Sequence, residues 1–261
     1  MLLTIDVGNT ETVLGMFDDR TLIDHWRFST GPERTVDELG LLVRGLIRES
    51  GNDPAALTAA SLGSVVPPMT SALTELCRRH LAIPVSIIDA AAPLPIRIAI
   101  DEPLTLGADR IANTLAAAEL YGRDTIAVDL GTATTFDCIT ATGDFIGGVI
   151  SPGIQTGAET LVRRTAKLPR VELERPLTVI GKRTETALRS GVFFAAVDAI
   201  DGMVRRIRDE WARPDVWVVA TGGLAPLIGS QCTTVNHIEP FLTLHGLAIA
   251  HRHLIARRDR P

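Results

Sequence analysis

A short phrase of residues occurs twice in this chain, and each copy follows an apolar run. The copies are Asp6-Val7-Gly8-Asn9-Thr10 and Asp129-Leu130-Gly131-Thr132-Ala133-Thr134-Thr135, and the runs are 2–5 and 125–128. We expect each run to be a buried strand that delivers a carboxylate and then a glycine to its end. A carboxylate there can hold a cation or a water, and the glycine lets backbone N–H groups approach phosphate oxygens. Two such turns facing each other would hold a metal-bound polyphosphate from both sides.

The predicted elements follow a similar order after each copy. In the first part, strands are predicted at 2–5, 12–17, 22–28, 59–65 and 85–88, and helices near 37–47, 69–80 and 107–121. In the second part, strands are predicted at 125–128, 134–139, 145–150, 216–220 and 233–238, and helices near 152–165, 184–211 and 241–257. This order predicts a duplicated βββαβαβα core in an α/β fold. We expect two domains, residues 1–115 and 116–261, with a ligand site in the cleft between them.

Composition narrows the class of protein. The chain has 261 residues, of which 46% are hydrophobic and 22% charged, as in a well-packed globular protein. Its formal net charge of −5 argues against a nucleic-acid binder, because phosphate contacts need a basic face. We expect no signal peptide, because the first residues lack a basic stretch and Asp6 interrupts their apolar run. We also expect no membrane span, because no apolar run is long enough to cross a bilayer. Because Cys77, Cys138 and Cys232 are isolated in sequence, we expect a cytoplasmic protein without membrane contact.

Three common site motifs are missing from the sequence. Gly181-Lys182 is followed by Arg183, and Pro176 stands where a phosphate-binding loop of the Gly-x-x-x-x-Gly-Lys-Ser/Thr type begins with glycine. No Gly-x-Gly-x-x-Gly follows a predicted strand, and no Gly-x-Ser-x-Gly elbow occurs. The repeated Asp-x-Gly turn, together with Thr221-Gly222-Gly223 after another apolar strand, therefore favours nucleotide binding by a different kind of loop.

Five motifs together resemble the type III pantothenate kinases. They are Asp6-Val7-Gly8-Asn9-Thr10, Gly107-Ala108-Asp109-Arg110, the phrase from Asp129 to Asp137, Gly147-Gly148-Val149-Ile150-Ser151-Pro152-Gly153, and Thr221-Gly222-Gly223-Leu224-Ala225. The resemblance runs from Asp6 to about Gly246. The two Asp-x-Gly motifs alone would indicate only the actin-like, sugar-kinase and heat-shock ATPase superfamily, whose members have two ribonuclease-H-like domains. The block from Gly107 to Arg110 is the specific element.

The resemblance implies an activity and its cofactors. The activity is ATP-dependent phosphorylation of pantothenate to 4′-phosphopantothenate, the first step of coenzyme A biosynthesis. The implied cofactors are Mg²⁺ and a monovalent cation, K⁺ or NH₄⁺, and the implied assembly is a homodimer. Two alternatives stay open: a non-catalytic relative that binds nucleotide or pantothenate as a regulator, and a kinase for another small alcohol substrate.

The same resemblance assigns site residues. The first phosphate loop consists of Asp6, Val7, Gly8, Asn9, Thr10, Glu11, Thr12 and Val13. The pantothenate-binding segment consists of Gly107, Ala108, Asp109 and Arg110. Asp6 is placed near the magnesium-bound phosphates, Thr132 in contact with ATP, and Asp129 at the monovalent cation. Asp109 is the implied base that acts on the primary hydroxyl, and Thr184 is a further substrate contact.

Elementary chemistry agrees with these assignments. An alcohol that attacks a γ-phosphate needs a carboxylate to accept its proton and cations to neutralise the transferring group. Asp109 would be the carboxylate that accepts the proton, while Asp6 and Asp129 would hold the cations. Asp109 would equally suit the first turn of a helix, where the helix dipole favours a negative charge. The chain departs from the family pattern at Ile100, usually tyrosine, and at Thr105, usually glutamate, which concerns the substrate and leaves the phosphate loops unchanged.

Overall fold

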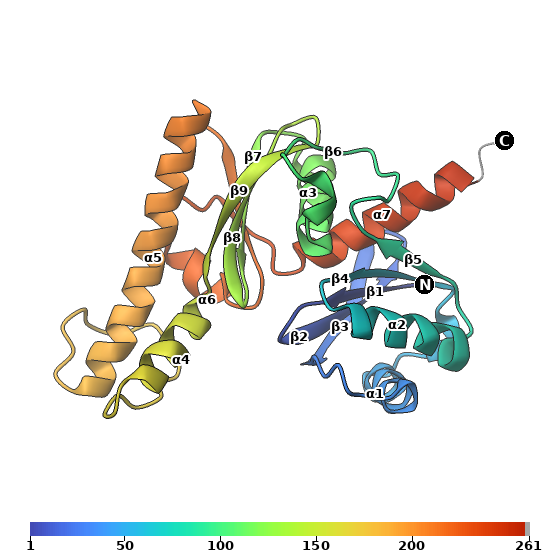
Figure 1. Ribbon diagram of the computed structural model, residues 1–261, viewed down its shortest axis with the longest axis horizontal. Coiled ribbons are helices and arrows are strands. Elements are labelled where there is room, and N and C mark those ends of the chain that lie inside the picture. Colours follow the sequence, from blue (N-terminus) through green and yellow to red (C-terminus); the bar gives the residue numbers. More distant parts are fainter. Residues whose placement is uncertain (259–261) are drawn as a thin grey trace. The chain divides into compact units, whose positions relative to one another are not determined.

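The computed structural model describes residues 1–258 as an α/β protein (Figure 1). Its contacts divide the chain into two compact units: Met1–Leu120 with the chain from Leu242 on, and Tyr121–Phe241. The predicted α/β class is confirmed, since each unit contains a mixed sheet with helices. The domain boundary predicted after residue 115 remains a prediction. The last residues of the predicted second domain, 259–261, lie outside the described part of the chain.

The first unit contains a five-stranded sheet in the order β3-β2-β1-β4-β5. Its strands are β1 Leu2–Val7, β2 Glu11–Asp18, β3 Thr21–Ser29, β4 Ala59–Ser64 and β5 Val85–Ile88. A short strand, β6 Arg97–Ile98, follows in the chain but is not part of this sheet. β1 pairs antiparallel with β2 and parallel with β4. Alternate residues of β1, namely Leu3, Ile5 and Val7, are buried in a core with Leu39 and Val43 of the first helix. The period of two therefore directs one face of β1 to this core.

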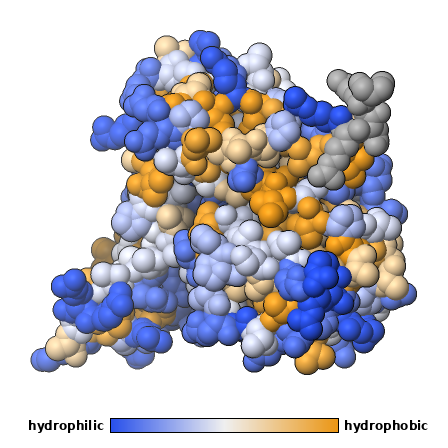
Figure 2. Space-filling view, turned by 45° about the vertical axis from the view of Figure 1, so that its right-hand side comes forward, coloured by the Kyte–Doolittle hydropathy of each residue, from blue (hydrophilic) through white to orange (hydrophobic). Residues whose placement is uncertain are grey.

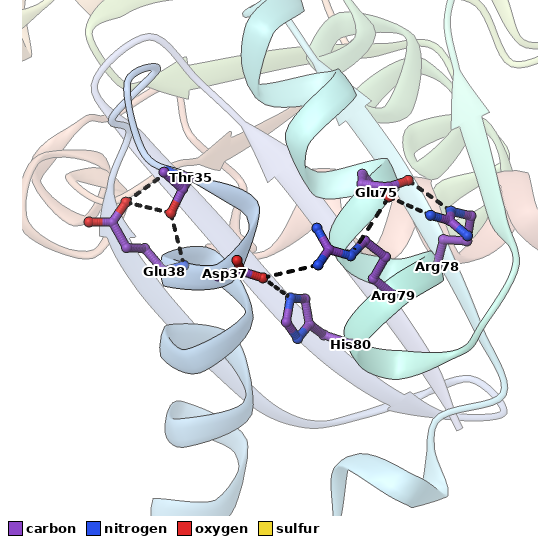
Figure 3. Close-up of polar contacts among 7 residues, drawn as sticks. All are labelled: Thr35, Asp37, Glu38, Glu75, Arg78, Arg79 and His80. Carbon is purple, nitrogen blue, oxygen red and sulfur yellow. Dashed lines mark hydrogen bonds and ion pairs between the residues drawn. The ribbon is translucent and has the colours of Figure 1, made fainter.

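The first unit also contains several helices. They are α1 Val36–Glu49, α2 Pro67–Leu76, which continues as a π-helix (η2) at Cys77–Leu81, α3 Ala108–Tyr121 and α7 Leu242–Arg258, with 3₁₀ turns η1 Pro54–Ala56 and η3 Pro103–Thr105. Figure 3 shows how α1 begins and how it is tied to η2. The Thr35 hydroxyl accepts from Glu38 N–H and the Glu38 carboxylate accepts from Thr35 N–H, which forms a capping box. Asp37 lies 2.9 Å from His80 Nε2 and 3.6 Å from Arg79.

The last helix, α7, packs on the opposite face of this sheet from the core of Leu3 and Ile5. The Ser61 hydroxyl of β4 donates to the Leu247 carbonyl at 2.8 Å. A Cβ added to Gly246 would lie 2.0 Å from the Ala112 carbonyl oxygen, so α7 and α3 meet backbone to backbone. Sequence order placed this helix in the second domain, but its packing places it in the first unit.

The second unit repeats the strand order of the first, which confirms the duplicated architecture. Its strands are β7 Thr125–Leu130, β8 Ala133–Ile139, β9 Asp144–Pro152, β10 Trp217–Thr221 and β11 His237–Ile238. Within this unit they are ordered β9-β8-β7-β10-β11, the same arrangement as β3-β2-β1-β4-β5. The helices are α4 Ile154–Arg164, α5 Thr184–Trp211 and α6 Ala225–Ile228, followed by a 3₁₀ turn (η4) at Gly229–Gln231. Side chains of α5, including Phe193 and Val204, pack on Ile126 and Val128.

Several large apolar side chains remain exposed after these cores close. On the face drawn in Figure 2, apolar residues lie in clusters among hydrophilic ones. Single exposed apolar side chains such as Leu41 are ordinary. Leu177, Val179 and Ile180 differ because they are neighbours in one segment and each is more than two-thirds exposed. Within residues 1–258, no helix combines the length and the apolar character that a membrane span requires.

The strand predicted at 233–238 is wrong in its extent, since β11 covers only His237–Ile238. Asp201 of α5 explains the difference. Its carboxylate accepts from the backbone N–H groups of Thr233 and Thr234 at 2.9 and 3.0 Å, and from both hydroxyls. These two N–H groups are therefore bound to a side chain and are lost to a strand ladder.

We predict that Asp201→Ala destabilises the protein by about 1–3 kcal/mol, because it leaves buried donors without an acceptor. Burial alone would raise the pKa of the Asp201 carboxyl, but the hydrogen bonds from Thr233 and Thr234 outweigh it, and its pKa lies below the usual range. The contribution is therefore present above the unfolded-state pKa of about 3.9 and is lost as the pH falls through the lower folded-state pKa. Urea unfolding at neutral and acidic pH measures both effects.

The matched control is Asp198→Ala, an exposed position on the same helix. It should change the free energy of unfolding by less than about 0.5 kcal/mol. Equal losses for the two variants would contradict a special role of Asp201.

Candidate functional site

The two repeated carboxylates occupy equivalent positions in the two units. Asp6 is the fifth residue of the six-residue strand β1, and Asp129 is the fifth of the six-residue strand β7. Both side chains are half-buried. The turn after each strand is closed by its glycine, since Gly8 N–H donates to the Glu11 carbonyl and Gly131 N–H donates to the Ala133 carbonyl, each at 3.0 Å. The structure therefore presents two Asp-x-Gly turns of similar design, one at the end of each central strand.

The first turn is anchored by one threonine. The Thr30 hydroxyl donates to the Gly8 carbonyl at 2.8 Å, and Thr30 N–H donates to the Thr10 carbonyl at 2.9 Å. Thr12 and Val7, both predicted as part of the phosphate loop, have fully buried side chains. Thr12 Oγ1 lies 3.0 Å from Thr30 Oγ1. Any ligand contact of Val7 and Thr12 would therefore use their backbone, whereas Asn9, Thr10 and Glu11 have exposed side chains.

The Gly107-Ala108-Asp109-Arg110 block lies near the same end of the first sheet as Asp6. Asp6 pairs with Gly63 of β4, and neighbouring strands are about 4.8 Å apart. A Cβ added to Gly63 would be 3.4 Å from the Ala108 Cβ at the start of α3. The fold of the first unit thus brings Asp6 and the first turn of α3 together, although about a hundred residues separate them in sequence.

Within this block the Asp109 carboxylate has a defined orientation. Its Oδ1 accepts from Arg110 N–H at 2.8 Å. It also folds back over Gly107, because a Cβ on Gly107 would lie 2.5 Å from that oxygen. Gly107 therefore leaves space for the carboxylate at the start of α3. Ile100 is half-buried, and the Thr105 hydroxyl donates to the Glu102 carbonyl at 2.8 Å.

The second turn is joined to the start of α4. The Thr132 carbonyl accepts from Gly153 N–H at 3.2 Å and from the Thr156 hydroxyl at 2.9 Å. A Cβ on Gly153 would lie 2.2 Å from that carbonyl oxygen, so only glycine fits at the N-cap of α4. The Thr132 side chain itself is exposed. Gly153 fixes the position of this turn, a role that the local sequence does not reveal.

Asp129 is paired with the end of β10. Its partner in the parallel ladder is Thr221, and the next residue, Gly222, has a φ of +87°. A Cβ on Gly222 would be 2.6 Å from Asp129 Oδ1. The Thr221 Oγ1 is buried and has no hydrogen-bond partner among residues 1–258. Sequence analysis identified Thr221-Gly222-Gly223 as a glycine turn but not as the neighbour of Asp129, because a long-range strand register leaves no local signal.

Thr184 is the first residue of α5, and its side chain is exposed. The chain before it is packed tightly on the helix, since a Cβ on Gly181 would lie 2.3 Å from Ala187 N. The structure thus brings together Asp6 with Gly107–Arg110 in the first unit and Asp129 with the end of β10 in the second. The role of Thr184 as a substrate contact, which the family resemblance implies, remains a proposal.

Similar solved structures show the fold. A putative 2-dehydro-3-deoxygalactonokinase from Sinorhizobium meliloti matches 97% of this chain and 97% of its own, with a TM-score of 0.56 and 14% identity. A putative Baf family transcriptional activator from Campylobacter jejuni matches 99% of this chain and all of its own, with a TM-score of 0.56 and 19% identity. At these identities the likeness shows the fold alone, which this chain shares with these two proteins.

Sequence comparison then identifies the family. The profile of the type III pantothenate kinases matches residues 2–206. A type III pantothenate kinase of Myxococcus xanthus is 44% identical over 95% of this chain and 97% of its own. That of Halalkalibacterium halodurans is 42% identical over 97% of this chain and 99% of its own. This chain belongs to the type III pantothenate kinases, a family of phosphotransferases.

We predict that Gly153→Ala raises the Michaelis constant for ATP by about tenfold or more, because the added methyl group displaces the Thr132 carbonyl and with it the second turn. The matched control is Gly157→Ala in the same helix, where an added Cβ meets nothing within 4 Å. It should leave the constant within about twofold, since alanine suits a helix interior. Steady-state kinetics of both variants measures the difference, and equal values would show that the contact with Thr132 does not position the turn.

Proposed function

We propose that this chain transfers the γ-phosphoryl group of ATP to the primary hydroxyl of pantothenate, which gives 4′-phosphopantothenate, the first intermediate of coenzyme A biosynthesis. One observation carries the proposal: type III pantothenate kinases align with nearly the whole chain at more than 40% identity. The position of Asp109 near the same sheet end as Asp6 supports it, because a base and a phosphate loop are then available in one unit.

In the proposed mechanism, Asp109 is the general base. Its carboxylate accepts the proton of the substrate hydroxyl while the hydroxyl oxygen attacks the γ-phosphorus and ADP leaves. Arg110 stands beside it and is suited to pair with the carboxylate of pantothenate. Backbone N–H groups of residues 9–11 in the first turn are proposed to contact the phosphates. Thr132 of the second turn is proposed as a further ATP contact. Thr184 is proposed as a further substrate contact.

The residues present fit the two implied cations. No group of three or more His, Cys, Asp or Glu side chains in the described part of the chain forms a metal site. A single carboxylate, Asp6, agrees with Mg²⁺ that is held mainly by ATP phosphates and water. A single carboxylate, Asp129, with neutral oxygens around it agrees with K⁺ or NH₄⁺. When bound, these cations would neutralise charge on the transferring phosphoryl group.

An assay of ADP release tests the activity and the base together. Wild-type protein with ATP, Mg²⁺ and K⁺ should release ADP only when pantothenate is added. Asp109→Asn should lower kcat by about 10²–10⁴-fold, because the amide cannot accept the proton, while ATP affinity is retained. Gly107→Ala should also lower kcat with little change in thermal stability, since its methyl displaces only the end of the Asp109 side chain.

The assay also separates the alternatives. Release of ADP with another small alcohol but not with pantothenate would favour a kinase of different specificity, for which Ile100 is the candidate cause. Nucleotide binding without turnover on any substrate would favour a regulatory relative. An Asp109→Asn enzyme with near wild-type kcat would show that another group is the base.

We further propose a homodimer, in which Leu177, Val179 and Ile180 lie at the interface, because monomers rarely expose several neighbouring large apolar side chains. Light scattering should give twice the 28.0 kDa of one chain. Ile180→Asp should shift the mass toward the monomer, whereas Leu41→Asp, at an exposed position of α1, should not. An unchanged mass for Ile180→Asp would place the interface elsewhere.

A cytoplasmic location is proposed from membership of the same family, and cell fractionation tests it. The free, buried thiols of the cysteines agree with this location. Burial raises the pKa of the Cys77 thiol to about 12, and burial with the nearby Asp201 and Asp198 charges raises that of Cys232 to about 12. Both thiols are therefore protonated and unreactive at neutral pH.

A further inference from the structure

The two units differ at one position next to their repeated carboxylates. In the first unit, Asp6 has Gly63 as its partner on the adjacent parallel strand. In the second unit, the equivalent partner of Asp129 is Thr221. The strand order is the same in both units, so this comparison is between matching places in the fold. Only the second unit therefore sets a hydroxyl group beside the carboxylate.

Thr221 and Asp129 lie on the same face of their sheet. Val218 and Ala220 on β10, like Ile126 and Val128 on β7, belong to the core that packs on α5. Because successive side chains alternate, Thr221 and Asp129 both point away from that core. Partners in a parallel ladder are about 4.8 Å apart, so the two side chains are neighbours.

The hydroxyl of Thr221 is buried without a partner. The residue is 1% exposed, and its Oγ1 has no hydrogen-bond partner among residues 1–258. A buried hydroxyl without a partner costs stability, and valine would fill the same space without that cost. The adjacent Gly222 adds no side chain, and a Cβ there would lie 2.6 Å from Asp129 Oδ1. The carboxylate of Asp129 and the hydroxyl of Thr221 thus lie on the same face of the sheet, at the ends of neighbouring strands. One of these two oxygen ligands is charged and the other is neutral.

We propose that Thr221 is a second ligand of the monovalent cation that Asp129 holds, a role for this residue that rests on the proposed cation site. A hydroxyl oxygen adds coordination without adding charge. One carboxylate with neutral oxygens suits a singly charged cation, whereas divalent cations favour several carboxylates or phosphates. The first unit lacks this oxygen at Gly63, which agrees with a different task for Asp6.

The test is cation binding by wild type, Thr221→Val and Thr221→Ser, measured as the K⁺ concentration that half-saturates the rise in unfolding temperature, with Na⁺ as reference. Thallium-205 NMR of Tl⁺, which replaces K⁺, gives a direct second readout. Thr221→Val should weaken K⁺ and Tl⁺ binding by about tenfold or more, the size expected for loss of one ligand to a charged group. Thr221→Ser, which keeps the hydroxyl, should stay within about threefold.

Two further measurements make the outcome decisive. Without K⁺, Thr221→Val should be at least as stable as wild type, because a methyl group replaces an unpaired hydroxyl. A lower stability than Thr221→Ser in that buffer would show an internal partner for the hydroxyl and overturn the proposal. At saturating K⁺ the Michaelis constant for ATP of Thr221→Val should match wild type, and a rise there instead of in the K⁺ requirement would assign the hydroxyl to the nucleotide.

Failure of this inference is distinguishable from failure of the proposed function. If wild type binds K⁺ over Na⁺ and Thr221→Val binds it equally well, Thr221 is not a ligand and the cation site at Asp129 stands. If wild type shows no preference for K⁺ by either readout, the cation site fails and the inference fails with it. Pantothenate-dependent ADP release is measured separately and is unaffected by either result.

Discussion

On the central strands β1 and β7, the carboxylate stands where the strand leaves its sheet. β1 and β7 are each paired on both sides, and apolar residues such as Ile5 and Val128 fill their buried stretches. A carboxylate in the middle of either strand would lose its hydration without a counter-charge. Asp6 and Asp129 stand one residue before the strand ends, half-buried, where water and ligands still reach them. The turns, helix starts and glycines of each candidate site are arranged around these two points.

Close backbone approach is the second constraint, and glycine makes it possible. A side chain at Gly107 would meet the Asp109 carboxylate, one at Gly153 the Thr132 carbonyl, and one at Gly222 the Asp129 carboxylate. Each of these glycines lies next to a proposed functional group and leaves it both space and a fixed position. These glycines are needed because any side chain at their positions would clash with the functional group. This explains why several motifs of this chain consist of glycine beside one polar residue.

The sequence predicted the elements well where their signals are local. Apolar runs located the central strands, and helical spacing of apolar residues located α1. The duplicated order also followed from these patterns. Three features escaped because they depend on distant residues: the shortening of β11 by Asp201, the return of α7 to the first unit, and the register that sets Thr221 beside Asp129. In the candidate site, residue types were predictable from motifs, but which of them meet was decided by strand pairing.

The return of α7 has a consequence for how the chain acquires its structure. The second unit is one continuous stretch, 121–241, whereas the first is assembled from both ends of the chain. Domains commonly fold in the order of their synthesis. In this chain the second unit is synthesised in full before the first unit is complete. Ser61 and Gly63 of the first sheet can contact Leu247 only after the second unit has been made. A nascent chain that stops before residue 242 would carry a complete second unit and a first sheet that lacks α7 on the face that bears Asp6.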